Sequence, residues 1–353
     1  MKEKVLLALS GGVDSSSAAL LLQERNYEVA ACTIKMHNYS DKTIDDAKRI
    51  CDFLKIQHIV IDSSEDFNNI VLKNFYEEYI SGRTPNPCVL CNLRVKWNSM
   101  IKKADELGIK YVATGHYALI KHFEDIDRYS IFRSKAVSKD QSYMLWRLSQ
   151  EFLSRTMFPL SSFSSKQEVR EFAAKNNLPS FDKGDSQDIC FIPDNDYCNF
   201  LENRYPESDE IKNTAGEIIL NNQPIASHTG YYKYTVGQRR GLGISYSEPL
   251  YVKSINKDTK QVVVDIEKNL YSKGLTAGSV NLFRYTLDNF EEKEYLVKIR
   301  YKDQGKPAVC KIENNKLIVT FNEPRKAVTM GQSVVLYDND ELIGGGIIEQ
   351  AID

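Results

Sequence analysis

The fold class of this 353-residue chain is decided by residues 4–15, KVLLALSGGVDS. An apolar run, 5–9, ends in a polar loop with two glycines, and a segment with helical periodicity, 13–25, follows at once. Glycines allow left-handed backbone and a close approach of a ligand. Exposed N–H groups at the start of a helix favour an anion. The stretch therefore predicts a strand, a phosphate-binding loop and a helix, in that order.

The same loop lacks the Gly-Lys-Ser/Thr ending of a Walker P-loop. The hydroxyl groups of Ser10 and Ser15 offer further donors to a phosphate. We therefore expect the loop to hold the pyrophosphate that ATP releases, rather than to transfer a terminal phosphoryl group. The alternative is a Gly-Gly turn capped by Asp14 or Ser15, which the complete six-residue string makes the weaker interpretation.

Strand and helix signals alternate through the first part of the chain. The expected strands are 5–9, 29–36, 58–62 and 111–117, and the expected helices are 13–25, 45–54, 65–80 and 93–107. This alternation predicts an α/β fold with a parallel sheet and helices on both faces. Ligands of such sheets bind beyond the carboxyl ends of the strands. Met36 and Gly115 lie there, although Met36 suits an adenine contact and ordinary core packing equally well.

From about residue 207 the helical periodicity fades and turn signals multiply. Short strand-like runs lie between the turns, at 231–236, 250–255, 261–266, 295–300, 308–312, 316–321, 333–337 and 343–348. This pattern predicts a small linking module followed by a β-barrel or sandwich. We expect domains at 1–205, 206–274 and 275–353.

The composition, 42% hydrophobic and 27% charged, is typical of a soluble globular protein. The formal net charge of −2 gives no overall attraction to nucleic acid, but it does not exclude a local basic face. The N-terminal apolar run leads straight into the loop and lacks a cleavage site, so it is not read as a signal peptide. No apolar stretch approaches the ~20 residues that span a bilayer. We expect a cytoplasmic protein without membrane association.

The seven cysteines do not suggest a disulfide framework, because their number is odd and no signal segment precedes them. Cys88 and Cys91 lie just before a helix, whose N-terminus is expected to lower the pKa of Cys91. Cys190 follows the polar run 185–188 and is either a reactive thiol or a small buried apolar side chain. A zinc site needs a second ligand pair, and none stands at ordinary spacing. We favour sulfur or redox chemistry and take the other cysteines as structural.

Further motifs occur in order along the chain, and their combination is highly specific: 10–16, 84–92, 115–117, 139–143, 189–192, 234–239 and 331–332. With them the chain resembles the tRNA-specific 2-thiouridylase family (MnmA or TrmU) of the PP-loop ATP pyrophosphatase superfamily, over essentially its whole length. The resemblance implies a parallel-sheet PP-loop domain (HUP-like, adenine nucleotide alpha hydrolase-like). A small linking domain and a C-terminal β-barrel, both in contact with tRNA, would follow.

The resemblance also implies an activity. ATP, with Mg²⁺, adenylates the C2 oxygen of the wobble uridine of tRNA and releases pyrophosphate. Cys190 carries a persulfide sulfur, received from a donor protein, and this sulfur replaces the oxygen as AMP leaves. Cys91 is the other catalytic thiol, which releases the sulfur and forms a transient disulfide with Cys190. We expect the enzyme to be a monomer.

The family's contact residues carry over to matching positions. Those implied for ATP are Ala8, Leu9, Ser10, Gly11, Gly12, Val13, Asp14, Ser15, Met36 and Gly115. Those implied for the target base are Asn86, Pro87 and Cys88, and those for the rest of the tRNA are His116, Lys139, Asp140, Gln141, Arg300, Tyr301 and Gln332. Without the resemblance, 139–141 would be read as a solvated turn and 300–301 as part of a barrel strand.

At one position the chain departs from the family, because Cys88 stands where aspartate is common. Three thiols, Cys88, Cys91 and Cys190, can hold a [4Fe–4S] cluster with one iron open, so cluster-dependent sulfur delivery is a second hypothesis. Other PP-loop enzymes, synthetases or amidotransferases, share the loop but need no paired thiols. A non-enzymatic RNA-binding module would explain only the β-rich half. Without ligand, we expect the Cα atoms of Cys91 and Cys190 to be more than ~7 Å apart, too far to bridge.

Overall fold

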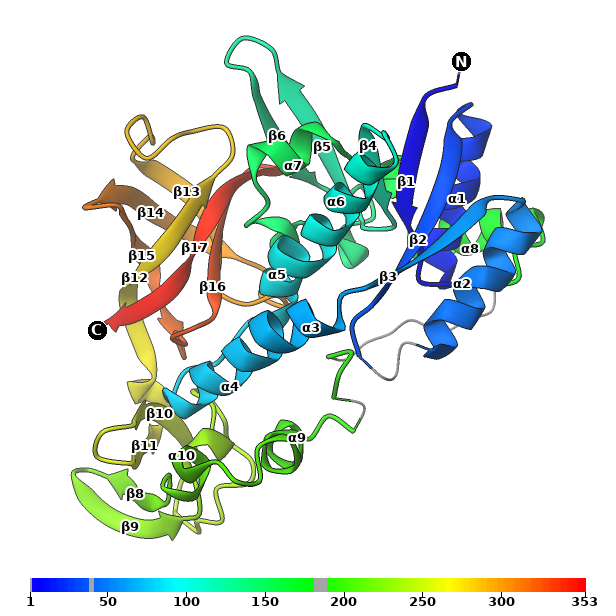
Figure 1. Ribbon diagram of the computed structural model, residues 1–353. Helices are drawn as coiled ribbons and strands as arrows, with labels where there is room; N and C mark the ends of the chain where they lie inside the picture. The colour runs from blue at the N-terminus through cyan, green and yellow to red at the C-terminus, as the bar shows by residue number, and fades with distance from the viewer. Residues whose placement is uncertain (1, 38–40, 181–188, 193) are drawn as a thin grey trace.

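The computed structural model describes residues 2–37, 41–180, 189–192 and 194–353. The polar run 185–188, which the sequence places before Cys190, lies outside the described residues. Three sheets follow one another along the chain, a parallel sheet, a small middle sheet and a β-barrel. Figure 1 shows the parallel sheet and the barrel on either side of a central group of helices, with the middle sheet below them.

The parallel sheet has the strand order β3-β2-β1-β4-β7, and all its pairings are parallel. Its strands are β1 (Lys4–Ala8), β2 (Glu28–Lys35), β3 (Gln57–Asp62), β4 (Tyr111–Thr114) and β7 (Thr156–Met157). Successive side chains of a strand face opposite sides of a sheet. Leu6 accordingly packs in one core with Trp97 and Met100, and Leu7 packs in another with Leu22 and Ile50. The predicted α/β fold with two covered faces is confirmed.

Helices cover both faces of this sheet, and two of them contain an inserted π-helical turn. The helices of the first part are α1 (Val13–Glu24), α2 (Asp41–Leu54), α3 (Ser64–Asp66), η2 (Phe67–Leu72), α4 (Lys73–Ile80), α5 (Pro87–Cys91), η3 (Asn92–Trp97), α6 (Asn98–Glu106), η4 (Val137–Lys139), η5 (Ser142–Leu145), α7 (Gln150–Ser154), η6 (Pro159–Ser162) and α8 (Lys166–Lys175). The π-helical turns are η2 and η3, and each joins the α-helices before and after it. The sequence predicted the helical segments 65–80 and 93–107 but not these turns.

The middle sheet has the order β10-β11-β8-β9 and packs against α4. Its elements are α9 (Tyr197–Arg204), α10 (Asp209–Lys212), β8 (Gly216–Leu220), β9 (Gln223–His228), η7 (Tyr231–Lys233), β10 (Leu250–Asn256), β11 (Gln261–Ile266) and η8 (Glu267–Asn269). The predicted strand 231–236 is wrong, because it begins as a 3₁₀ helix. Strands β8 and β9 were not predicted, and residues 221–222 form the turn between them. Asn221 and Asn222 form that turn with φ of 52° and 62°, which Asn tolerates.

The C-terminal strands close into a barrel, which settles the choice between barrel and sandwich. The strands are β12 (Tyr271–Leu282), β13 (Lys293–Lys298), β14 (Lys306–Glu313), β15 (Lys316–Lys326), β16 (Ser333–Asp338) and β17 (Glu341–Ile352). Strand β12 pairs with both β15 and β17, so the ring is complete. Closure removes the open edges of the sheet.

A hairpin that the sequence did not predict joins the first part of the chain to the barrel. It consists of β5 (Ala118–Phe123) and β6 (Arg128–Arg133), and β6 pairs with β17 of the barrel. Arg128 donates to the main-chain carbonyls of Leu282 and Tyr285, each at 3.0 Å. Trp146 donates its indole N–H to Ser333 Oγ at 2.9 Å. The first part of the chain and the barrel therefore share one core, and the boundary expected at 274/275 stays a prediction.

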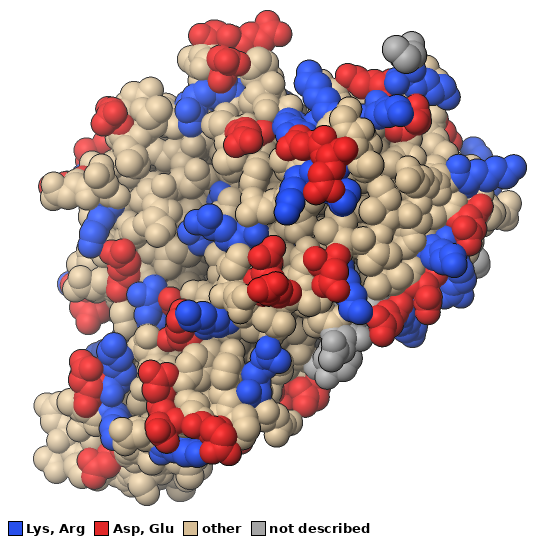
Figure 2. Space-filling view, viewed as in Figure 1, with Lys and Arg blue, Asp and Glu red and all other residues tan. Residues whose placement is uncertain are grey.

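The surface does not display a single-sign field on the face of Figure 2, where Lys and Arg are interspersed with Asp and Glu. None of the helices in the described ranges is long and apolar enough to cross a membrane.

Candidate active site

The phosphate loop follows β1 and is shaped chiefly by Gly11. Gly11 has φ +67°, and a Cβ atom there would stand 2.5 Å from the Cβ of Asp46. Gly12 has an extended conformation, with φ −83° and ψ 161°, and is the N-cap of α1. The expectation that both glycines provide left-handed backbone is therefore wrong for Gly12. Only Gly11 needs to be glycine for conformational reasons.

The hydroxyl groups of the loop bond within the loop. Ser15 Oγ accepts from the main-chain N–H of Ser10 and donates to the carbonyl of Gly12, each at 3.2 Å. Ser16 Oγ donates to the same carbonyl at 2.9 Å. These bonds hold the loop in shape without a ligand, which reduces the ordering that binding would otherwise require.

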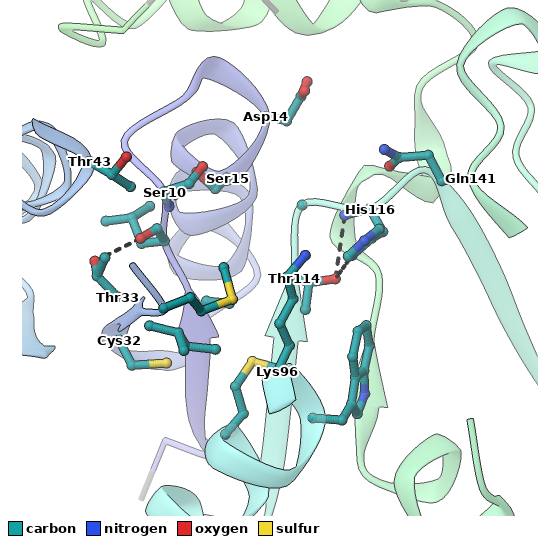
Figure 3. A pocket seen from close by; sticks show the side chains of 17 residues that line it. Ser10, Asp14, Ser15, Cys32, Thr33, Thr43, Lys96, Thr114, His116 and Gln141 are labelled. Atoms are coloured by element: carbon teal, nitrogen blue, oxygen red, sulfur yellow. Dashed lines mark hydrogen bonds between the residues drawn. The ribbon is translucent and has the colours of Figure 1, made fainter. Parts of the chain in front are cut away.

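Asp14 is held by two groups from other elements. Its carboxylate accepts from Tyr117 Oη at 2.6 Å and from Lys166 Nζ, on α8, also at 2.6 Å. Figure 3 shows the Asp14 side chain pointing away from the centre of the pocket. The carboxylate therefore fixes the start of α1 to the segment after β4 and to α8.

A cavity of about 300 Å³ lies beyond the carboxyl ends of β1, β2 and β4. The predicted nucleotide residues that line it are Ala8, Leu9, Ser10, Asp14, Ser15, Met36 and Gly115. Gly12 and Val13 are not part of this lining, and Gly11 lines a neighbouring cavity with Lys42 and Arg49. The cavity is placed where the sheet topology predicts a ligand, and the contacts of its lining with ATP stay a prediction.

Gly115 brings the segment after β4 against the phosphate loop. A Cβ atom at Gly115 would lie 2.8 Å from the main-chain nitrogen of Ser15. The sequence suggested that this glycine lets backbone approach a nucleotide. In the structure the group it approaches most closely is the loop itself, so any larger residue would push the loop aside.

His116 and Gln141, predicted for tRNA, line the same cavity. Thr114 Oγ1 and His116 Nδ1 are 2.8 Å apart, and the His116 ring packs against Trp97 and Phe158. Burial, helped by the charge of Lys96, lowers the pKa of His116 to about 3. His116 is therefore neutral at physiological pH. The amide oxygen of Gln141 accepts from the main-chain N–H of Tyr117 at 3.0 Å.

Lys96 is a site residue that the sequence analysis missed. Its side chain lines the cavity, and Figure 3 shows it extending toward the space between the phosphate loop and His116. No spacing rule for a regular α-helix would connect Lys96 with Cys91, five residues earlier. A signal was nevertheless present, because a lysine interrupts the otherwise apolar positions Val95 and Trp97 of a helix that follows the cysteine pair.

The three thiols of interest all lie within electrostatic reach of this lysine. Cys91 is 5% exposed, and its Sγ lies 3.6 Å from Sδ of Met36, a residue of the cavity lining. Cys190 is exposed and Cys88 is half-buried. Lys96 is close enough to each of the three thiols for a direct electrostatic interaction. The exposure of Cys190 rules out the interpretation of this residue as a buried apolar side chain.

The pKa expected for Cys91 was wrong in direction. Cys91 is the last residue of α5, so the cysteine in the first turn of that helix, where the helix N-terminus acts, is Cys88 and not Cys91. Burial raises the pKa of Cys91 to about 12, and the Lys96 ammonium opposes that shift. Desolvation by the surrounding protein likewise raises the pKa of Cys88 and of Cys190, although Cys190 is exposed by surface area, and the Lys96 charge opposes both shifts. A bound anion beside Lys96, or a substitution that removes the Lys96 charge, would therefore change the thiol pKa of all three cysteines.

Cys190 is positioned by the apolar pair that follows it. Phe191 and Ile192 are buried, and the Phe191 ring lies 5.5 Å from that of Phe67 and 5.3 Å from that of Phe75. These rings belong to η2 and α4. The pair therefore holds the exposed thiol beside the helices that carry the rest of the site.

The arrangement of the thiols does not fit a metal cluster. Within the described part of the chain, which includes Cys88, Cys91 and Cys190, no three His, Cys, Asp or Glu side chains are grouped so as to hold a metal ion. A lysine ammonium also lies within electrostatic reach of all three sulfurs. Cys51 and Cys310 are buried away from this cavity, as expected of structural cysteines, whereas the buried Cys32 is part of the cavity lining.

The residues predicted for the target base and tRNA lie in two groups. Gln332 donates to the carbonyls of Thr84 at 3.2 Å and Pro85 at 2.8 Å, so the barrel holds the segment before α5. Asn86 is the N-cap of α5, and Pro87 begins it.

Beyond the barrel strand β13, Tyr301 packs against Tyr143 and lies near Lys139, Asp140 and Cys88. The neighbouring Arg300 donates to the carbonyl of Lys326 at 2.8 Å. The Asp140 carboxylate accepts from Ser142 Oγ at 2.7 Å and shapes a turn. A turn at 139–141 is what the sequence predicts without the family resemblance. Contact of either group with tRNA stays a prediction.

Comparison with known proteins gives matches over the whole chain. The family model described as tRNA methyl transferase HUP domain matches residues 3–194, the tRNA methyl transferase PRC-barrel domain matches 199–265, and the aminomethyltransferase beta-barrel domain matches 272–348. The tRNA-specific 2-thiouridylase MnmA of Caldicellulosiruptor saccharolyticus is 43% identical over 369 residues, covering 100% of both chains. The protein of the same name from Carboxydothermus hydrogenoformans is 42% identical and covers 99% of both.

Proposed function

The chain belongs to the family of tRNA-specific 2-thiouridylases and is a tRNA-uridine 2-sulfurtransferase, and on that premise we propose how its site performs the reaction. ATP adenylates the C2 oxygen of the wobble uridine, and a persulfide sulfur on Cys190 replaces that oxygen. One observation carries this proposal. The lining of the nucleotide cavity and the buried thiol of Cys91 meet at Met36, with the two sulfur atoms 3.6 Å apart.

The first step is activation of a poor electrophile. The C2 carbonyl of uracil is urea-like, so its oxygen has to become a leaving group before sulfur can replace it. The C2 oxygen bonds to the α-phosphorus of ATP, the bond to the β-phosphate breaks, and the N3 proton of the base is lost. The loop 10–15 holds the departing pyrophosphate with its N–H groups. ATP enters as its Mg²⁺ complex, so the ion arrives as part of the substrate.

The second step is sulfur transfer. The terminal sulfur of the Cys190 persulfide, as its anion, bonds to C2, and the C2–O bond breaks with its electron pair leaving on AMP. The Cys91 thiolate then attacks Cys190 Sγ. The disulfide between Cys91 and Cys190 forms, the persulfide bond breaks, and its electron pair stays on the sulfur at C2. N3 takes up a proton to give 2-thiouridine, and an external thiol reduces the disulfide.

The exposure of the two thiols suits these roles. Cys190 is exposed, so a persulfide-carrying donor protein can reach it. Cys91 is buried beside the cavity and is protected from outside oxidants. We propose that Asn86, Pro87 and Cys88 meet the target base, which leaves its stack to reach the cavity. We further propose that the middle sheet and barrel contact tRNA, that the enzyme is a monomer, and that it acts in the cytoplasm on tRNA.

Persulfide delivery is preferred to cluster-dependent delivery. The third thiol, Cys88, favours a cluster, but the described cysteines are not grouped to hold one. Iron and sulfide analysis of anaerobically purified protein tests this choice. About four irons per chain, with thiolation lost when they are removed, would overturn persulfide delivery.

The function itself is tested with unmodified tRNA, ATP and a persulfide source. We expect 2-thiouridine together with AMP and pyrophosphate, and no 2-thiouridine from the Cys91→Ser or Cys190→Ser variant. Cys310→Ser, a change at a buried barrel cysteine, is the matched control and should keep activity. Folded wild-type protein that releases pyrophosphate but makes no 2-thiouridine would instead favour a synthetase or amidotransferase.

A further inference from the structure

Lys96 reaches the nucleotide cavity from the helix that also carries Cys91. The cavity is lined by Lys96 together with Ser10, Ser15 and Met36. In Figure 3 the Lys96 side chain extends toward the space between the phosphate loop and His116. No other lysine or arginine is found in the described lining of this cavity.

The π-helical turn η3 explains how Lys96 comes to share a side with Cys91. Residues five apart in a regular α-helix are separated by about 140° around the axis. In a π-helical turn the hydrogen bond joins residues five apart, so they lie nearly above one another. Cys91 is the N-cap of η3 and Lys96 is its fifth residue. The turn therefore aligns the lysine with the thiol, and π-helical turns are common at functional sites.

The ammonium of Lys96 has no hydrogen-bond or ion-pair partner in the described part of the chain. The other charged group in the lining, Asp14, is already bound by Lys166 and Tyr117. His116, across the cavity, is neutral. A half-buried cation without a carboxylate partner costs free energy unless a ligand or reaction intermediate supplies negative charge.

We propose that Lys96 is a catalytic residue, whose ammonium contacts the α-phosphate of the adenylated uridine and stays beside the negative charge throughout sulfur transfer. This inference rests on the proposed function. As the S–C2 bond forms and the C2–O bond breaks, one negative charge moves from the attacking sulfur to the phosphate of AMP. Lys96 lines the cavity and is within electrostatic reach of the thiols, so its charge can stabilise the attacking sulfur at the start of the transfer and the phosphate at its end. Preorganised charge of this kind is a major source of rate enhancement.

The test compares Lys96→Met, which removes the charge at similar length, with Lys96→Arg, which keeps it. Lys102→Met is the matched control, because Lys102 is exposed on α6 of the same continuous helix. Each variant is assayed for 2-thiouridine formation in a single turnover with preloaded persulfide. The pH dependence of iodoacetamide alkylation at Cys91 and Cys190 is followed by mass spectrometry without ATP. Melting temperatures report on folding.

We expect Lys96→Met to lower the single-turnover rate by about 10²-fold or more. Its thiol alkylation should move to higher pH by about one unit or more. Lys96→Arg should recover much of the rate, and Lys102→Met should match the wild type. A Lys96→Met rate within about threefold of the wild type would overturn the proposal, as would a lost rate with an unchanged alkylation profile. If the wild type itself makes no 2-thiouridine, the proposed function fails instead.

Discussion

At the scale of single residues, the site depends on close approaches that leave little freedom. Gly11 lies against Asp46, and Gly115 lies against the backbone of Ser15. Asp14 carries two strong hydrogen bonds, from Tyr117 and Lys166. The loop is therefore held in shape by its neighbours before any ligand binds. This explains how a string of six small and polar residues keeps a defined shape.

His116 provides a prediction of pH dependence. Its pKa is about 3 in the folded protein and 6.5 ordinarily, so between these values the unfolded chain binds a proton that the native protein does not. Stability is therefore lost as pH falls below 6.5, by about 1.4 kcal/mol for each pH unit. We expect the His116→Gln variant to show a shallower loss of unfolding free energy between pH 6.5 and 4.5, measured in urea.

An NMR titration of the His116 ring protons checks the cause directly. They should show no protonation step between pH 5 and 8. A step near 6.5 would contradict the burial argument, whatever the urea data show.

At the scale of elements, two features place the thiols. The π-helical turn η3 aligns Lys96 with Cys91, and the pair Phe191–Ile192 holds Cys190 on the aromatic cluster of η2 and α4. The same cluster includes Val252 and Val262 of the middle sheet. The position of Cys190 thus depends on packing from three parts of the chain.

Phe191→Ala tests this anchor. Removing a buried phenylalanine costs about 3–5 kcal/mol of packing, and here the loss falls on the segment that carries Cys190. We expect thiolation to fall about tenfold to a hundredfold, because the sulfur is misplaced, while pyrophosphate release persists. Phe53→Ala, at a ring that is 46% exposed on α2, is the control. Equal losses of thiolation and pyrophosphate release in Phe191→Ala would argue for general unfolding instead.

At the scale of the whole molecule, the barrel is not an appended module. Hairpin β5–β6 extends its sheet, Tyr143 donates to the carbonyl of Ser333 at 2.9 Å, and Gln332 holds the segment before α5. The barrel therefore helps to position Asn86, Pro87 and Cys88. A change in the barrel can reach the catalytic site through these contacts.

Arg128→Met tests whether the two parts unfold together. The change leaves carbonyls of the barrel, those of Leu282 and Tyr285 among them, without their donor, and should cost about 2–4 kcal/mol. We expect hydrogen exchange to accelerate in both β1 and β14, with Lys135→Met, an exposed change just after the hairpin, as the control. Faster exchange confined to β14 would show that the barrel unfolds alone.

The sequence by itself determined the features that are written in consecutive residues. The loop between β1 and α1, the alternating strands and helices of the first part and the barrel strands follow from local patterns, whereas the reactive character of Cys190 stays a prediction. Local geometry is decided by neighbours in the chain, so such patterns can be read without a structure. The family resemblance, carried by strings of the same kind, pointed to the activity.

Only the tertiary structure decided which residues and elements lie next to each other when they are distant in the sequence. It buried Cys91 and so reversed the expected direction of its pKa, because desolvation depends on everything packed around a group. It also inserted the turn that brings Lys96 to the cavity, and paired a hairpin from the first part with the barrel. These relations join residues distant in sequence or break the α-helical period. No local pattern encodes them, since they arise from the packing of the complete chain.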